Sequence, residues 1–164
     1  MDIVKAKMED LPVILRIYEI ARNFMRKTGN PTQWKSTFSP ESLLTEDICA
    51  GNLYEVISDD TIHAVFALVI GEEPTYAKIE QGRWISETEY GTLHRIASDG
   101  RIHGVFDAIH AFSVREIGHL RIDTHKNNKI MQHLIEKNCY RKCGVIYVAD
   151  GSPRIAYEKI EGRM

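Results

Sequence analysis

The sequence has no long apolar run, little cysteine and no excess of either charge. None of its apolar runs approaches the ~20 residues needed to cross a bilayer, and the N-terminal stretch MDIVKAKMEDLP lacks the apolar centre of a signal peptide. The cysteines are three in 164 residues, an odd number, so a disulfide framework is not expected. We therefore expect a cytoplasmic protein with reduced thiols.

The charge balance excludes two classes of partner. The chain carries 21 Lys and Arg against 23 Asp and Glu, a formal net charge of -2. Such a chain has no field strong enough to attract nucleic acid or an anionic membrane, so neither partner is expected. Its length and its 43% of hydrophobic residues fit one compact domain over residues 1–164.

The first half of the chain alternates between strand and helix patterns. Helical spacing of apolar residues and turn residues at the boundaries set the limits of each segment. The pattern predicts a strand at 3–6, a helix from Asp10 to Thr28, a shorter helix from Ser39-Pro40 to Gly51, and a hairpin of strands 53–57 and 62–70 around Ser58-Asp59-Asp60.

The second half begins with a polar segment, 71–89, which we expect to be a surface loop or strand extension. The pattern then predicts a strand at 90–98, a helix at 104–117, a strand at 120–123, a helix that starts at Asn127 or Asn128 and buries Ile130, Met131, Leu134 and Ile135, and strands at 145–148 and 155–160. This order predicts an α/β (α+β) fold, with a twisted mixed sheet of about six or seven strands and about four helices.

The stretch from Ser98 to Phe106 is the most informative one. A strand ends in Ser98-Asp99-Gly100 and the chain runs through Arg101 and Gly104 directly into a helix. Such a turn directs several backbone N–H groups and a helix N-terminus at one point, as a pyrophosphate requires. The alternative is an ordinary turn with a solvated arginine.

Three segments together resemble the GNAT superfamily of acetyltransferases, in particular its small bacterial members. They are the strand His94-Arg95-Ile96-Ala97-Ser98, the turn Arg101-x-x-Gly104, and the run from Leu120 to Gln132, which contains Asn127-Asn128 and Met131. The expected element order agrees with that family over nearly the whole chain. The resemblance implies an N-acetyltransferase that moves an acetyl group from acetyl-CoA, its cosubstrate, to a primary amine by direct attack in a ternary complex, without a metal.

The resemblance also implies where acetyl-CoA binds. Its pantetheine would pair with the strand backbone, its pyrophosphate would lie on the amides of the turn, and the next helix would contribute further contacts. The implied cofactor-binding residues are Ile96, Ala97, Arg101, Ile102, His103, Gly104, Val105, Phe106, Asn127, Asn128 and Met131. For Asn127 and Asn128 the alternative is an ordinary helix cap.

Two positions depart from the family pattern. The family turn usually reads Gln/Arg-x-x-Gly-x-Gly/Ala, and Phe106 places a bulky side chain at its third key position. Many relatives also carry Asn-x-x-Ala-x-x-Leu-Tyr, whose tyrosine protonates the departing thiolate, whereas the aligned residue here is Ile135. A thiolate with a pKa near ~8.5 is a tolerable leaving group, so water can replace that acid.

Four residues are candidates for the base that makes the amine neutral. Histidine titrates near neutral pH, and burial tunes a glutamate upward. The candidates are His125, His94, Glu87 and Glu89, with His125 and then His94 placed first as catalytic residues. The alternative for His125 is that it only hydrogen-bonds the neighbouring backbone.

The acceptor is a small-molecule or peptide amine that the sequence does not identify. Trp84, in the segment 71–89, is the candidate substrate-binding residue, although it would equally complete the core. A homodimer agrees with the resemblance, since the family often forms dimers. The rival function is an acyl-CoA-binding module with slow or no turnover, whereas the spacing of His125, His133, Cys139 and Cys143 argues against zinc.

Overall fold

A computed structural model of the chain describes residues 1–34 and 41–161. The described chain divides into two compact units, one made of residues 1–68 and 94–109 and the other of residues 69–93 and 110–164. The predicted helix start at Ser39-Pro40 lies outside the described residues.

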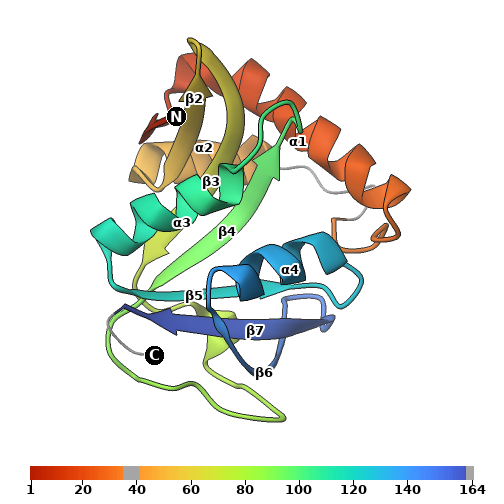
Figure 1. Cartoon of the computed structure of the whole chain (residues 1–164), viewed down its shortest axis with the longest axis vertical. Coiled ribbons are helices and arrows are strands. Elements are labelled where there is room, and N and C mark those ends of the chain that lie inside the picture. The colour runs from red at the N-terminus through yellow and green to blue at the C-terminus, as the bar shows by residue number, and fades with distance from the viewer. Residues whose placement is uncertain (35–40, 162–164) are drawn as a thin grey trace. The chain divides into compact units, whose positions relative to one another are not determined.

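The first unit begins with a strand and two helices, followed by a hairpin (Figure 1). Its elements are β1 (Asp2–Lys5), the 3-10 turn Met8–Asp10, α1 (Leu11–Lys27), α2 (Glu41–Ala50), β2 (Leu53–Ser58) and most of β3 (Thr61–Ile70). The second half of β4 (Gly91–Ser98) and the start of α3 (Val105–Glu116) complete it.

The hairpin of β2 and β3 forms where the sequence predicted it. Ser58 pairs with Thr61, so the turn has only two residues, and both of them, Asp59 and Asp60, have positive φ angles of 50° and 59°. A two-residue turn of this kind matches the natural twist of an antiparallel pair, and Asp tolerates the left-handed conformation better than most residues do.

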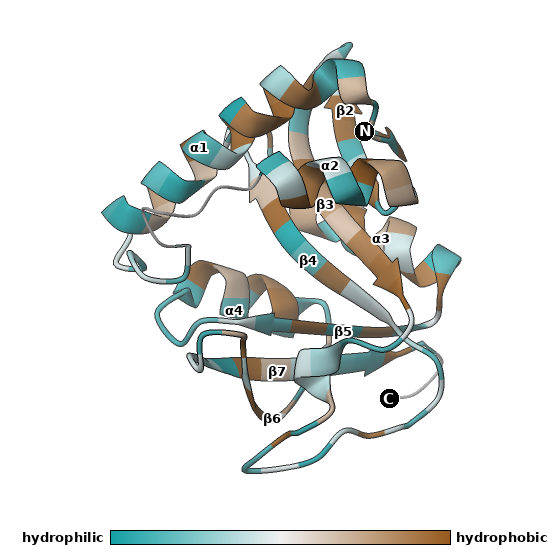
Figure 2. Ribbon diagram, turned by 180° about the vertical axis from the view of Figure 1, so that it is seen from behind, coloured by the Kyte–Doolittle hydropathy of each residue, from teal (hydrophilic) through white to brown (hydrophobic). Residues whose placement is uncertain are grey.

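Both helices bury their apolar faces against the strands of this unit. Ile14, Ile17 and Tyr18 of α1 and Leu44 of α2 belong to one buried cluster with strand residues that include Val65. Figure 2 shows the corresponding alternation of apolar and polar segments along α1. An amphipathic helix gains its stability mainly from such burial rather than from its intrinsic propensity.

The second unit contains the last three strands and α4 (Figure 1). β5 (His119–Thr124), β6 (Arg141–Tyr147) and β7 (Pro153–Ile160) lie in the order β5-β7-β6, and α4 spans Lys129–Lys137. The segment that precedes β4 contains a 3-10 turn, Pro74–Tyr76, and a single bridge between Glu80 and Val145 of β6.

The seven strands found in the described residues have the order β1-β2-β3-β4-β5-β7-β6. β4 and β5 are parallel, whereas β1 with β2, β2 with β3, β5 with β7 and β6 with β7 are antiparallel. This mixed sheet and the four α-helices within residues 1–34 and 41–161 confirm the predicted α/β fold class.

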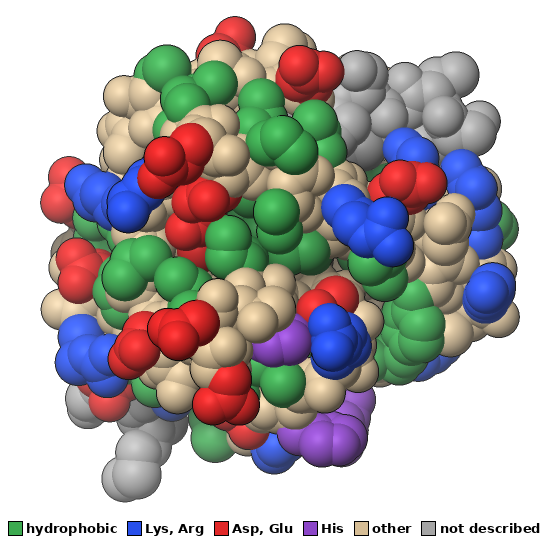
Figure 3. Space-filling model, turned by 90° about the horizontal axis from the view of Figure 1, so that it is seen from above, with side chains coloured by type: hydrophobic (Ala, Val, Ile, Leu, Met, Phe, Trp, Pro, Cys, Tyr) green, Lys and Arg blue, Asp and Glu red, His purple; other side chains and the backbone are tan. Residues whose placement is uncertain are grey.

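One prediction within α4 was wrong. Ile130 was expected on the buried side, but its side chain is 48% exposed, whereas Ile135 is fully buried. α4 starts only at Lys129, so Ile130 belongs to its first turn and lies before the stripe that packs. In the described residues no helix has the length and apolar character needed to span a membrane, and Figure 3 shows acidic and basic side chains interspersed with apolar ones on the face that it views.

Candidate functional site

In the first unit, the predicted site begins on β4. Its ladder with β5 comprises two pairs, Gly91 with Leu120 and Thr92 with Arg121, and β4 continues to Ser98. Ala97 is buried, whereas His94 and Ile96 are half-buried.

The turn after β4 is built by side chains that bond to its own backbone. Ser98 Oγ accepts the N–H of Gly100 at 3.1 Å, and Asp99 Oδ1 accepts the N–H of Arg101 at 2.9 Å. The second carboxylate oxygen, Asp99 Oδ2, lies 2.9 Å from Nδ1 of His63 on β3, and the N–H of Asp99 bonds to the His63 carbonyl. Asp99 thus fixes both the shape of the turn and its attachment to β3.

Two glycines allow the chain to enter α3 from this turn. Gly100 and Gly104 have φ angles of 74° and 75°, the left-handed region that glycine adopts without strain. α3 begins at Val105, and its first backbone bond runs from the N–H of Ala108 to the carbonyl of Gly104 at 3.1 Å. The N–H groups of the first turn of any α-helix have no partner within that helix, and its N-terminus favours an anion.

The structure places the predicted phosphate-binding residues together on this turn. Arg101, His103 and Gly104 are exposed, and Ile102 is half-buried. Val105 and Phe106 are buried, with Phe106 4% exposed, so the bulky side chain at the third key position is shielded from solvent. Because Asp99 already takes the Arg101 amide, fewer amides are open to a phosphate than the sequence suggested.

In the second unit, the candidate residues follow β5. The N–H of Asn127 donates to Nδ1 of His125 at 3.0 Å, and the N–H of Asn128 bonds to the His125 carbonyl at 2.9 Å. Asn128 is the N-cap of α4, because its Oδ1 accepts the N–H of Met131 at 3.0 Å. Asn128 is therefore a helix cap, which was the alternative to a cofactor contact. The two roles are compatible in one residue.

His125 is 9% exposed, and burial, together with the positive charges of Arg154 and Lys126, lowers its pKa. The imidazole is therefore neutral at neutral pH. Because Nδ1 accepts the Asn127 N–H, the neutral ring carries its proton on Nε2. Nε2 of His125 is thus a hydrogen-bond donor. Nδ1 could accept a proton only after its bond with the Asn127 N–H broke.

Sequence reasoning missed Thr124, the last residue of β5. Its side chain is fully buried, and among the described residues its Oγ1 has no hydrogen-bond partner. A buried hydroxyl without a partner costs about 1–3 kcal/mol unless something else bonds to it, so a bound ligand group is one explanation. A threonine in a strand gives no sequence signal of this kind.

The other two candidate bases, Glu87 and Glu89, are exposed. Burial was the condition for a glutamate to serve near neutral pH, and the structure does not provide it. Ile135, which the resemblance aligns with the tyrosine of many relatives, is fully buried. Among the described residues no group of three or more His, Cys, Asp or Glu is arranged to hold a metal ion.

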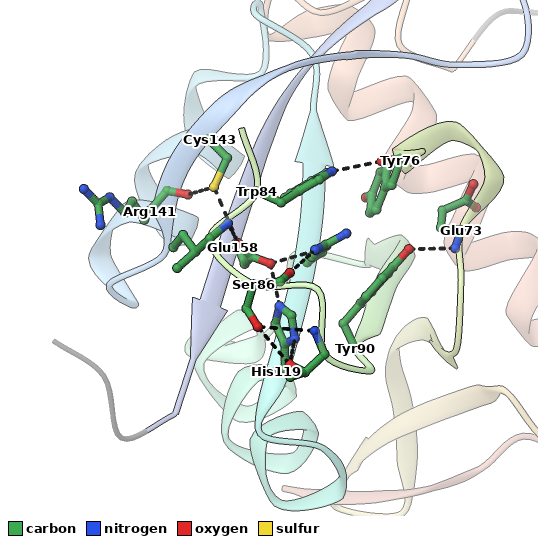
Figure 4. Close-up of polar contacts among 12 residues, drawn as sticks. Glu73, Tyr76, Trp84, Ser86, Tyr90, His119, Arg141, Cys143 and Glu158 are labelled. Carbon is green, nitrogen blue, oxygen red and sulfur yellow. Dashed lines mark hydrogen bonds and ion pairs between the residues drawn. The ribbon is translucent and has the colours of Figure 1, made fainter. Parts of the chain in front are cut away.

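Trp84 belongs to an aromatic and ionic cluster of the second unit (Figure 4). Its indole N–H donates to the carbonyl of Tyr76 at 2.9 Å, and the guanidinium of Arg121 lies 4.0 Å from the centres of both the Trp84 and Tyr90 rings. The side chain therefore completes the packing of this unit. It also lines a hollow of 540 Å³ whose walls are Arg83, Trp84, Ile85, Ser86, Glu87, Arg141, Lys142 and Cys143.

Sequence reasoning also missed the centre of this cluster, Glu158 of β7. Its buried carboxylate accepts from Nε2 of His119 at 2.5 Å, from Nε of Arg121 at 2.8 Å and from the N–H of Ile85 at 2.5 Å (Figure 4). Burial and Glu158 raise the pKa of the neighbouring Cys143 to about 11, so this thiol stays protonated and is no nucleophile.

No protein-family model and no curated protein sequence matches the chain. Solved structures do match. A GNAT-family acetyltransferase from Streptococcus agalactiae is 30% identical, with a TM-score of 0.90 over 99% of this chain and 96% of that one. A GNAT-family acetyltransferase from Listeria monocytogenes is 14% identical with a TM-score of 0.72, over 97% of this chain and 94% of that one.

A third similar structure is the ribosomal-protein-S18-alanine N-acetyltransferase from Escherichia coli, 12% identical with a TM-score of 0.65 over 99% of this chain and 95% of that one. At such low identity, the Listeria and Escherichia structures show the fold alone. The Streptococcus relative is similar in sequence as well, over nearly the full length of both chains. The chain belongs to the GNAT family of acetyltransferases.

Proposed function

We propose that this acetyltransferase uses acetyl-CoA as its cosubstrate, that it acetylates a primary amine, and that residues 1–164 form one N-acetyltransferase domain. The observation that supports the proposal is the turn from Ser98 to Gly104, which the resemblance to the family implies as the binding place of the pyrophosphate. Its shape is fixed by Ser98 and Asp99, and it leads into the N-terminus of α3. A fixed turn and a helix N-terminus are suited to bind a phosphate group.

In this proposal the cofactor contacts come from β4, from the turn that follows it and from the start of α4. Ile96 and Ala97 of β4 offer backbone groups to the pantetheine, as a neighbouring strand would. The residues 101–106 hold the pyrophosphate, and Asn127, Asn128 and Met131 add contacts at the start of α4. The unpartnered Oγ1 of Thr124 supports a polar ligand group at the end of β5.

The reaction is a direct attack in the ternary complex. The lone pair of the neutral amine attacks the carbonyl carbon of the thioester, the C–N bond forms and the C–S bond breaks. The amine loses a proton, and the departing thiolate gains one. A backbone N–H of β4 supplies the hydrogen bond to the developing oxyanion, and an interaction of this type contributes ~10²–10³ in rate.

The two histidines have separate roles. The neutral His125 carries its proton on Nε2 and donates a hydrogen bond to the departing thiolate, in place of the tyrosine that Ile135 replaces, and water supplies the proton that this thiolate gains. His94 of β4 then takes the proton of the amine. The acceptor is a small-molecule or peptide amine, for which Trp84 provides one wall.

The first experiment is calorimetric titration of the purified chain with acetyl-CoA. We expect micromolar binding that Arg101→Ala and Gly104→Val both weaken, because the first removes a cation and the second strains a position with a φ of 75°. Arg115→Ala is the matched control, since Arg115 is an exposed arginine at the other end of α3. A screen of polyamines, amino acids, aminoglycosides and N-terminal peptides with thiol detection would then identify the acceptor.

The second candidate function is an acyl-CoA-binding module with little turnover. The buried Ile135 in place of the catalytic tyrosine favours it. Tight binding of acetyl-CoA without thiol release in the presence of any amine would establish this alternative. Failure of acetyl-CoA and of longer acyl-CoAs to bind would exclude both functions.

A further inference from the structure

Arg95 has a backbone conformation that its strand does not explain. Five non-glycine residues of the described chain have positive φ angles, and Arg95, with a φ of 50°, is the one that lies within a strand. For a residue with a Cβ atom this left-handed conformation is unfavourable, and it persists only where surrounding contacts hold it. Such residues are concentrated at functional sites.

Two side chains from two helices hold Arg95 in place. The hydroxyl of Tyr18, on α1, donates to the backbone carbonyl of Arg95 at 2.5 Å. The carboxylate of Asp47, on α2, accepts from Nε and Nη2 of Arg95 at 3.0 and 2.6 Å through a single oxygen, Oδ2. One contact therefore fixes the peptide that follows Arg95 and the other fixes its side chain.

Both contacts are shielded from water. Tyr18 is 2% exposed, and the side chains of Arg95 and Asp47 are 21% and 13% exposed. A shielded charge pair and a buried hydroxyl bond are stronger than their counterparts on the surface. The chain thus uses residues 18 and 47, which lie far from residue 95 in the sequence, to maintain one unfavourable dihedral angle.

We propose that Tyr18 and Asp47 are positioning residues for acetyl transfer: they hold Arg95 in its left-handed conformation and thereby direct the backbone of β4 at the thioester. This inference rests on the proposed function, in which Ile96 and Ala97, the two residues after Arg95, contact the pantetheine. If residue 95 had the negative φ angle of a regular strand, the peptide groups on either side of it would point in other directions. The role belongs to the conformation of Arg95 and not to its charge.

Tyr18→Phe tests the first contact. It removes one hydroxyl and keeps the ring, whose centre lies 5.6 Å from the centre of the Trp34 ring. We expect the kcat for thiol release from acetyl-CoA to fall about tenfold or more, while the KM for acetyl-CoA changes less than about threefold, since a small misplacement of the reacting groups affects mainly the chemical step. The matched control is Tyr140→Phe, which loses a buried hydroxyl contact with His110 at 3.0 Å in the other unit. Equal effects of the two variants would overturn the proposal.

Arg95→Gly and Arg95→Ala separate conformation from charge. Both remove the guanidinium, but only glycine adopts a φ of 50° without strain. We expect Arg95→Gly to retain the higher kcat and to melt about 2–4 °C above Arg95→Ala. An equally low kcat in both variants would mean that the guanidinium itself is required, and would overturn the proposal.

These results are distinguishable from failure of the proposed function. If the wild-type chain neither binds acetyl-CoA nor releases thiol, the proposed function is excluded, and the catalytic role of Tyr18 and Asp47 is excluded with it. The order of melting temperatures still decides whether Arg95 is held in a strained conformation. If the wild type is active and Tyr18→Phe matches it in kcat, only the positioning role fails.

Discussion

Asn127 donates its backbone N–H to Nδ1 of His125 at 3.0 Å, and this bond limits what the imidazole does. Burial and the charges of Arg154 and Lys126 lower its pKa, so the ring stays neutral to a lower pH than a free histidine does. Protonation would place a second proton on Nδ1 and break the loop bond. The folded chain therefore favours neutral His125.

His125 is expected to make the folded chain less stable as the pH falls below about 6.5. Above about pH 6.5, the ordinary histidine pKa, both the folded and the unfolded chain hold neutral His125, and its contribution to stability is complete. As the pH falls below that value the unfolded chain takes the proton first, so the free energy of unfolding decreases until the pH passes the folded pKa. We expect His125→Asn to lose this decrease, because Asn accepts the same N–H and does not titrate.

The measurement is urea unfolding between about pH 5 and 8 for the wild type, His125→Asn and the exposed control His133→Asn. The control should retain the acid-dependent decrease of the wild type. If His125 is catalytic as proposed, His125→Asn also loses about 10²–10⁴ in kcat while it remains folded. An unchanged pH dependence in His125→Asn would contradict the assignment of the proton to Nε2.

The sequence predicted those contacts that join residues close together in the chain and missed those that join distant residues. The Asn128 cap and the His125 bond to the backbone join residues two or three positions apart, so a sequence pattern contains them. Glu158 and its nitrogen donors Arg121, His119 and Ile85 are 37 to 73 residues apart, and a charged residue in a strand is normally assigned to solvent. The left-handed Arg95 gave no signal, because arginine has no preference for that conformation.

At the scale of elements, the segment between β3 and β4 is fastened to the end strand β6 by close backbone contacts. Glu80 and Val145 exchange two backbone bonds, at 2.9 and 2.8 Å. A Cβ atom at Gly82 would lie 1.9 Å from the carbonyl oxygen of Cys143, and one at Gly144 would lie 2.4 Å from the carbonyl oxygen of Glu80. The sequence predicted a surface loop or strand extension for this segment, but not that two glycines let it approach β6.

We expect Gly144→Ala to destabilise the chain by about 2–4 kcal/mol, because backbone atoms must move to admit the methyl group. Gly118→Ala is the control: a Cβ there would have as its nearest neighbour the Glu161 Cβ at 3.5 Å, an ordinary contact, and should change stability by less than about 1 kcal/mol. Denaturant unfolding measures both. Similar free energies of unfolding for the two variants would show that the close approach of Glu80 to β6 does not contribute to stability.

Glu158 fastens the same segment to β5 and β7 through Ile85, His119 and Arg121 (Figure 4). We expect Glu158→Ala to cost about 3–5 kcal/mol, because it leaves the buried guanidinium of Arg121 without its carboxylate. The exposed pair of Lys78 and Glu80, 3.4 Å apart, is the comparison, and Lys78→Ala should cost less than about 1 kcal/mol. A loss below about 1 kcal/mol in Glu158→Ala would mean that water replaces the carboxylate.

At the scale of the whole molecule, the two compact units share elements, since the boundary passes through β3, β4 and α3. Element order predicted the fold class because each strand and helix carries its own periodicity. The division into units depends on contacts between distant segments, which no local pattern contains. Because β3, β4 and α3 each continue from one unit into the other, we expect the two units to unfold together, as the proposal of a single domain requires.

The two tryptophans test this proposal, because Trp34 belongs to one unit and Trp84 to the other. In Trp84→Phe the remaining indole reports the first unit, and in Trp34→Phe it reports the second. We expect the fluorescence transition of each variant in urea to coincide with its own circular dichroism transition, because a single domain of this size normally unfolds in one step. A fluorescence midpoint that departs from the circular dichroism midpoint of the same variant would show that the units unfold separately, and that residues 1–164 hold two domains.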